Sequence, residues 1–145
     1  MGVENNGIKL QFDDDHWTLV DTQFEKTSNR TWETLFSLGN GYIGMRGTFE
    51  EGLDQFSTEG TFINGFYDSF ALHYPEKFIG YAETDQVMLN VANARLIRLM
   101  FEDGETYNPL ARKSRILAYT RRLKMRSGLL IREFTWQSPT GRVIR

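Results

Sequence analysis

The chain has 145 residues, is 40% hydrophobic and carries a net charge of −2; it contains no cysteine, which excludes disulfide bonds and thiolate metal sites. His16 and His73 are the only imidazoles and lie far apart in the sequence, so we expect no zinc site. No apolar run approaches the roughly 20 residues of a membrane span, and the first residues lack the apolar core of a signal peptide, so we expect a soluble, cytoplasmic protein.

The beginning of the chain predicts short strands. Apolar and polar residues alternate over 8–12, the pattern of a half-buried strand. Three aspartates follow at 13–15, where a solvated turn is the simpler interpretation because the ligand spacing of a calcium loop is absent. A second short strand is expected over 17–20, and 27–30 is expected to be a loop.

The most distinctive stretch is a glycine-rich segment at 33–51. Its Gly-Asn-Gly tripeptide at 39–41 predicts a tight reversal between two short strands, because Gly and Asn tolerate positive φ. Gly44 and Gly47 are then expected in the second strand, where a missing side chain usually marks a bulge or a close backbone approach. This segment is interpreted either as a packed hairpin or as a specific functional surface.

The middle of the chain is less regular. A strand is predicted over 61–67, followed at 68–85 by a long excursion with one helical turn and several aromatic residues. Such rings can stack on the C–H faces of a sugar, or they can fix the loop to the domain. The sequence leaves both roles open.

Antiparallel strands are predicted for the rest of the chain. The Asp-Gly pair at 103–104 favours a hairpin, and further strands are expected over 116–125 and 129–136, with another beginning at 142. The repeated hairpins amount to about nine or ten strands. The predicted fold is therefore mainly β, an antiparallel β-sandwich with long loops.

Three blocks carry a family resemblance: ETLFSLGNGYIGMRGTFEE at 33–51, GTFINGFYD at 60–68 and YTRRLKMRSGLLIR at 119–132. In this order they resemble the N-terminal region of glycoside hydrolase family 65, which contains the maltose, trehalose and kojibiose phosphorylases and related glucosidases. One stretch departs from the family. At 90–94 the resemblance leads us to expect an Asn-x-Pro-Asn-Trp kind of sequence, whereas this chain has Asn-Val-Ala-Asn-Ala.

The resemblance implies a larger parent protein. In family 65 the N-terminal domain is a large β-sandwich joined by a helical linker to an α/α barrel that carries the chemistry. Residues 1–145 are accordingly expected to form an incomplete part of that super-β-sandwich, without the barrel. The implied parent is a homodimeric inverting α-glucoside phosphorylase, which uses inorganic phosphate as co-substrate to convert an α-linked disaccharide into β-glucose 1-phosphate and glucose, or a related hydrolase.

No catalytic residue is assigned within this chain. Inverting cleavage needs a carboxylic acid that protonates the leaving oxygen, and by resemblance that acid is a glutamate of the barrel. Glu50 and Glu51 are adjacent, so in a strand they would point to opposite faces and could not act as a pair. The chain alone is therefore expected to be inactive, with no metal ligand and no cofactor of its own.

Asn40, Tyr42 and Arg46 are the candidate site residues. Arg46 lies between Gly44 and Gly47, where a neighbouring backbone can approach closely. The three residues could form the rim of the barrel's oligosaccharide pocket, or they could hold the sandwich against the barrel through charge-assisted hydrogen bonds. Both hypotheses remain open at this point.

Charge is unevenly distributed along the chain. Residues 1–73 contain 4 Lys or Arg and 12 Asp or Glu, whereas residues 74–145 contain 13 and 7. Nucleic-acid binding is not expected, because the basic residues of 121–126 alternate between strand faces and no RNA-binding motif is present. The simpler explanation is that the basic ribbon at 106–145 faces either the acidic N-terminal portion or another domain. A free-standing carbohydrate-binding module stays as the alternative function.

Overall fold

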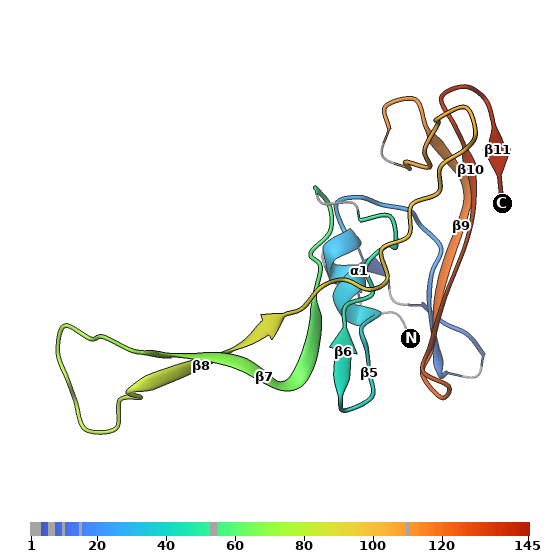
Figure 1. The fold of residues 1–145 in the computed structure, drawn as a ribbon. Helices are drawn as coiled ribbons and strands as arrows, with labels where there is room; N and C mark the ends of the chain where they lie inside the picture. Colours follow the sequence, from blue (N-terminus) through green and yellow to red (C-terminus); the bar gives the residue numbers. More distant parts are fainter. Residues whose placement is uncertain (1–3, 6–7, 10, 15, 53–54, 110) are drawn as a thin grey trace.

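In the computed structural model, the residues described are 4–5, 8–9, 11–14, 16–52, 55–109 and 111–145. They form a five-stranded and a four-stranded antiparallel sheet, a separate pair of strands and one short helix (Figure 1). The predicted mainly β, antiparallel class is confirmed. The elements are β1 (Glu4–Asn5), β2 (Ile8–Lys9), β3 (Gln11–Phe12), β4 (Thr18–Asp21), α1 (Asn29–Leu35), β5 (Leu38–Gly39), β6 (Ile43–Met45), β7 (Thr61–Ala71), β8 (Thr84–Asn90), β9 (Arg115–Lys124), β10 (Leu129–Gln137) and β11 (Val143–Ile144).

The five-stranded sheet is built on the β9–β10 hairpin, with the strand order β11-β10-β9-β4-β3. The ends of both strands were predicted to within one residue, from two apolar-rich runs separated by the Ser-Gly turn at 127–128. Leu123 pairs with Leu130 on β10 and with Leu19 on β4, so three leucines lie side by side across the sheet. These side chains supply one wall of the hydrophobic core.

The other wall of the core comes from α1. Trp32 and Phe36 are four positions apart, which places both on one face of the helix, and they join Leu19 and Leu123 in the buried cluster. The expected loop at 27–30 was wrong at its second half, because α1 begins at Asn29. A seven-residue helix presents too few turns for an amphipathic period, and its N-cap makes no side-chain hydrogen bond that would mark its start.

The four-stranded sheet has the order β5-β6-β7-β8. The reversal predicted between two short strands is confirmed: Gly39 pairs with Gly44 across the β5–β6 hairpin, and Gly41 has a φ of 85° in the turn. β6 ends at Met45, so Gly47 lies beyond the strand and not within it. Gly47 still marks a close backbone approach, since its amide donates a 2.9 Å hydrogen bond to the Glu33 carbonyl.

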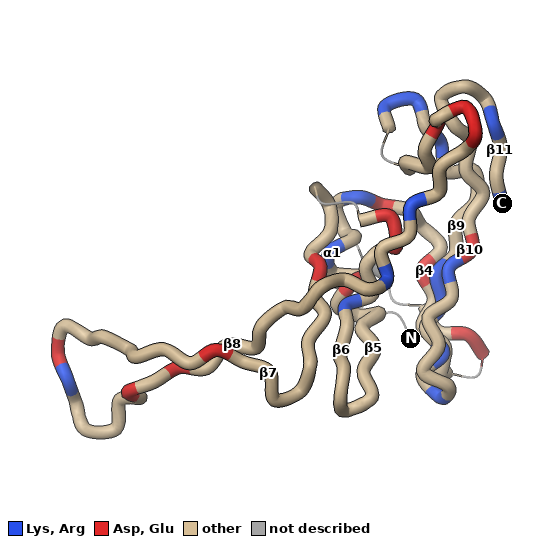
Figure 2. The backbone as a smooth tube through the Cα atoms, in the orientation of Figure 1, with Lys and Arg blue, Asp and Glu red and all other residues tan. Residues whose placement is uncertain are grey.

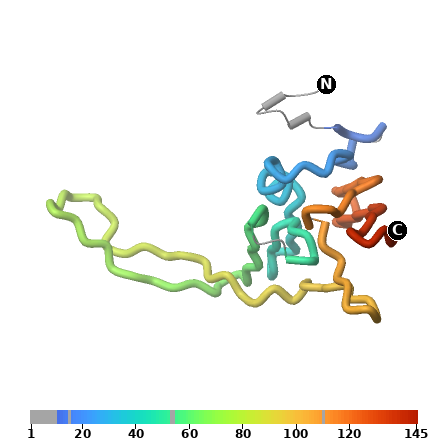
Figure 3. Tube along the Cα trace, turned by 90° about the horizontal axis from the view of Figure 1, so that it is seen from above, coloured from blue at the N-terminus to red at the C-terminus, as the bar shows by residue number. Residues whose placement is uncertain are grey.

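The distal parts of β7 and β8 project from the body as a two-stranded arm (Figures 1 and 3). The arm begins where the β7–β8 register shifts between Phe62 and Tyr67, next to Gly65 with its φ of 78°. The expected excursion over 68–85 was therefore wrong at both ends, because β7 continues to Ala71 and β8 starts at Thr84. A strand is predicted from the alternation of buried apolar and exposed polar residues. That alternation is missing here, because every described side chain of β8, and of β7 from Asn64 on, is exposed.

The segment between the two sheets is mostly irregular. The hairpin predicted at 103–104 is reduced to one bridge between Met100 and Thr106, with Gly104 at a φ of 82° in the turn.

The helix found among the described residues has seven residues, too few to cross a membrane.

Candidate functional site

Asn40 and Tyr42 lie at the turn of the β5–β6 hairpin and have different surroundings. The Asn40 side-chain oxygen accepts hydrogen bonds from the backbone amides of Tyr42 and Ile43, at 3.0 and 2.9 Å. Its amide group therefore shapes the turn. Tyr42 is 67% exposed, so its ring is free to contact another molecule or domain.

Arg46 follows β6 and joins three parts of the chain. Its Nε donates to the Thr58 carbonyl at 2.8 Å, and one terminal nitrogen donates to the Arg30 carbonyl at 2.9 Å. The same nitrogen lies 3.9 Å from the Glu33 carboxylate. The guanidinium thus fastens the segment after β6 to α1 and to the loop before β7.

Glu33 is fully buried and has a complete set of partners. Its carboxylate accepts hydrogen bonds from Asn29 Nδ2 at 2.9 Å, from Ser57 Oγ at 2.5 Å and from the Thr58 amide at 2.9 Å. Together with Arg46 these donors compensate the cost of burying a charge. Sequence reasoning did not single out this centre, since its partners lie up to 25 residues away.

A second buried ion pair joins the two ends of the chain. Arg121 on β9 lies 3.4 Å from the Asp21 carboxylate on β4 and donates to the Gly47 carbonyl at 3.0 Å. Its guanidinium carbon also lies 4.7 and 5.0 Å from the ring centroids of Phe36 and Phe49, within cation–π distance. Burial raises the pKa of Asp21 above its ordinary value, although the Gln23 amide and the Arg121 charge oppose that shift.

Arg132 on β10 forms a third group of ion pairs. It makes two hydrogen bonds to the Glu51 carboxylate, one of them 2.9 Å long, and lies 2.8 Å from Glu50. Burial alone would lower the pKa of Arg132, but the hydrogen bond and charge of Glu51, together with the charge of Glu50, raise it, so the net shift is upward. The adjacent glutamates predicted to face apart instead share one arginine, because they lie in a turn and not in a strand.

These ion pairs account for the uneven charge of the sequence. Arg121 and Arg132 come from the basic portion, and their partners Asp21, Glu50 and Glu51 come from the acidic portion. Figure 2 shows acidic and basic segments alternating through the body of the molecule. The prediction that the basic ribbon faces the acidic portion is confirmed for these side chains.

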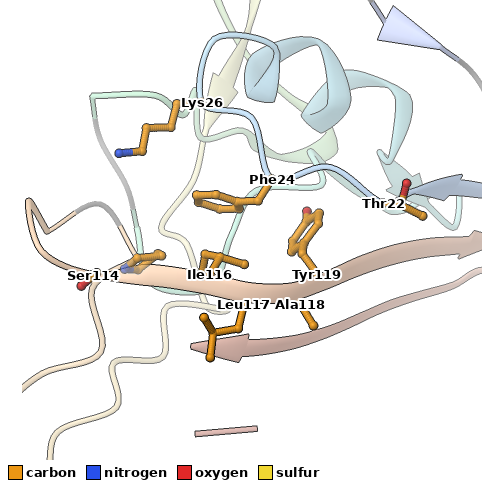
Figure 4. A pocket seen from close by; sticks show the side chains of 9 residues that line it. Thr22, Phe24, Lys26, Ser114, Ile116, Leu117, Ala118 and Tyr119 are labelled. Carbon is orange, nitrogen blue, oxygen red and sulfur yellow. The ribbon is translucent and has the colours of Figure 1, made fainter. Parts of the chain in front are cut away.

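An open hollow of about 390 Å³ lies between β9 and the segment that follows β4. Phe24, Lys26 and Tyr119 line it, with the rings of Phe24 and Tyr119 side by side (Figure 4). The two rings pack edge to face with their centroids 5.5 Å apart. Burial raises the pKa of Tyr119 above its ordinary value.

The arrangement favours structural support over acid–base chemistry. A glycosidic acid must reach the leaving oxygen of a bound sugar, whereas Asp21, Glu33 and Glu51 are buried and each is engaged by an arginine. Within the described ranges, no three or more His, Asp or Glu side chains gather where they could hold a metal ion. Of the predicted trio, Asn40 and Tyr42 are exposed, Tyr42 at 67%, whereas Arg46 is partly buried.

Comparison with known proteins gives a consistent set of matches. Residues 19–145 match the model of the glycosyl hydrolase family 65, N-terminal domain. The chain is 46% identical over 131 residues to an alpha,alpha-trehalose phosphorylase from Thermoanaerobacter brockii, covering 88% of this chain and 16% of that protein. It is 31% identical over 130 residues to a kojibiose phosphorylase from Halothermothrix orenii, covering 90% of this chain and 15% of that protein.

A solved structure shares the fold. A putative kojibiose phosphorylase from the human microbiome superimposes with a TM-score of 0.72 at 30% identity, covering 89% of this chain and 16% of that one. The chain therefore spans about one sixth of the length of the relatives it matches.

Proposed function

Because the chain belongs to the N-terminal domains of glycosyl hydrolase family 65, we propose that it is the non-catalytic N-terminal region of an inverting α-glucoside phosphorylase. The parent reaction is the phosphorolysis of an α-linked glucose disaccharide to β-glucose 1-phosphate and glucose, in the cytoplasm. Trehalose is the first substrate to test, since identity is 46% to a trehalose phosphorylase and 31% to a kojibiose phosphorylase.

The proposal assigns the chain the role of a scaffold within a homodimeric parent. Residues 1–145 are part of its β-sandwich, which packs against the α/α barrel that holds the oligosaccharide. The observation that carries this role is the state of the buried acids: Asp21, Glu33 and Glu51 are each fixed by an arginine and shielded from solvent. Such carboxylates stabilise an interior but are poorly placed to protonate a sugar oxygen.

Within this scaffold we assign Tyr42 to the contact with the barrel or the rim of its substrate pocket. Its ring is exposed at a turn whose shape Asn40 fixes. Arg46 supports that hairpin from below through its bonds to Thr58 and Arg30. The assignment predicts that replacing Tyr42 affects the parent enzyme without unfolding this chain.

The test uses the isolated chain. Incubated with phosphate and trehalose, kojibiose or maltose, it should release no β-glucose 1-phosphate, and calorimetric titration with the same sugars should give no saturable heat. Turnover above the buffer blank would contradict the non-catalytic assignment. Saturable binding of one disaccharide would favour the alternative, a free-standing carbohydrate-binding module.

A further inference from the structure

The β7–β8 arm exposes an unusual amount of apolar surface. Soluble monomers rarely expose contiguous apolar patches larger than a few hundred Å². The large apolar side chains exposed on the arm are Phe66, Tyr67, Phe70, Tyr74, Phe78, Ile79, Tyr81, Val87, Met88 and Leu89. At its tip the rings of Tyr74 and Phe78 pack against Tyr81, with centroids 4.9 and 5.5 Å apart, and so form an apolar knob.

The arm also has little support from the body. β7 pairs with β6 only at Thr61, Phe62 and Ile63, so beyond that point its partner in the sheet is β8. An isolated two-stranded ribbon is at best marginally stable in water. Figures 1 and 3 show the arm extending away from the core in both views. A covering partner would therefore stabilise this element.

The β8 edge of the arm is suited to strand addition. β8 is the last strand of its sheet in the described part of the chain, so one row of its backbone N–H and C=O groups faces outward. Natural edge strands usually carry lysine, proline or a bulge that prevents pairing. β8, with the sequence TDQVMLN, has Asp85 as its one charged residue and lacks both lysine and proline.

We infer that the arm is a docking element onto which the remaining polypeptide of the parent phosphorylase folds, with one of its strands added to the edge of β8. The relatives are about six times longer than this chain, which supplies ample polypeptide for this role. The arm carries the carboxylates Asp68, Glu76, Glu83 and Asp85 against Lys77 alone. The expected occupant is thus an extended, apolar segment with basic residues opposite these acids.

This inference rests on the proposed function, and its experiment separates the two. In a chimera, this chain replaces the matching region of the Thermoanaerobacter brockii trehalose phosphorylase. The chain contains no cysteine, so Met88→Cys introduces a reporter on β8, and Ser127→Cys places a control in the exposed turn between β9 and β10. The rate of maleimide labelling at each position is followed by peptide mass spectrometry, in the isolated chain and in the chimera.

We expect labelling at position 88 to be at least tenfold slower in the chimera than in the isolated chain, while labelling at position 127 changes little. A chimera that phosphorolyses trehalose but labels equally fast at position 88 would overturn this inference and leave the proposed function standing. Protection in the isolated chain that grows with concentration to a discrete dimer would also overturn it, because a second copy would then be the occupant. An insoluble or inactive chimera would count against both the docking of the arm and the proposed function.

Discussion

Arg121 joins the acidic and the basic portions of the chain. It neutralises Asp21, donates to the Gly47 carbonyl and lies between two aromatic rings, with its own side chain almost fully buried. Removing one partner of a buried ion pair leaves the other charge uncompensated, which typically costs about 3–5 kcal/mol. Arg121→Met should therefore lower the free energy of unfolding by about that amount in urea titrations.

The neighbouring Arg122 is the matched control. It faces the other side of β9, where it is about one-third exposed and pairs with the exposed Glu133 at 2.6 Å. Exposed ion pairs contribute about 0–1 kcal/mol, so Arg122→Met should change stability little. Equal losses for the two variants would contradict the central position given to Arg121. A double variant, Asp21→Asn with Arg121→Met, should recover part of the loss, because no charge is then left unpaired.

The sequence predicts the inward direction of these arginines but not their partners. Arg121 shares a strand face with Leu123, and Arg132 shares one with Phe134, so the alternation predicts that both point inward. Their carboxylate partners lie 100 and 81 residues earlier, respectively, and no local pattern identifies them. Asn40, Tyr42 and Arg46 were found through the glycine-rich motif, and their proposed roles at the barrel remain a prediction.

The contact between α1 and the segment after β6 depends on Gly47. A Cβ atom built on Gly47 would lie 2.6 Å from both the Cβ and the carbonyl oxygen of Phe36, a clash that involves backbone and cannot be relieved by a rotamer change. Gly47→Ala should therefore destabilise the chain by about 1–3 kcal/mol, the usual range for overpacking. Chemical denaturation followed by tryptophan fluorescence would measure this, since Trp32 lies in the same core cluster as Phe36.

Gly44 provides the comparison for this substitution. It lies within β6, and the nearest atom to an added Cβ would be the Leu38 carbonyl oxygen at 4.0 Å. Gly44→Ala should shift stability by no more than about 0.5 kcal/mol, as expected for a site with room for the methyl group. If both variants lost the same stability, the close approach at Gly47 would not be what limits this position.

Elements differ in how well the sequence predicts them. β9 and β10 follow from a long alternation of inward and outward residues, and the β5–β6 reversal follows from its Gly-Asn-Gly turn. α1 was missed because seven residues are too few to establish a helical period. The strands of the arm were underestimated because apolar residues lie on both of their faces, so the pattern of a half-buried strand is absent.

The chain combines a compact core with an apolar arm. The core is held by ion pairs that connect distant parts of the sequence, whereas the arm pairs mainly with itself. The family could be recognised from three sequence blocks, but the projection of the arm could not, because the register shift of β7 and β8 near Gly65, where the arm begins, leaves no mark in the composition. The exposed, self-paired arm agrees with the proposal that further polypeptide completes this region.

The rate of phosphate-dependent trehalose cleavage by the chimera decides whether this chain can serve as the N-terminal region of a phosphorylase. It is to be compared with the rates of the isolated chain and of the Thermoanaerobacter brockii enzyme lacking the matched region. We expect the chimera to release β-glucose 1-phosphate within about tenfold of the intact enzyme, because we propose that the catalytic groups lie outside this region, and we expect the other two proteins to be inactive. Activity of the isolated chain, or a chimera no more active than the shortened enzyme, would contradict the proposed scaffold role.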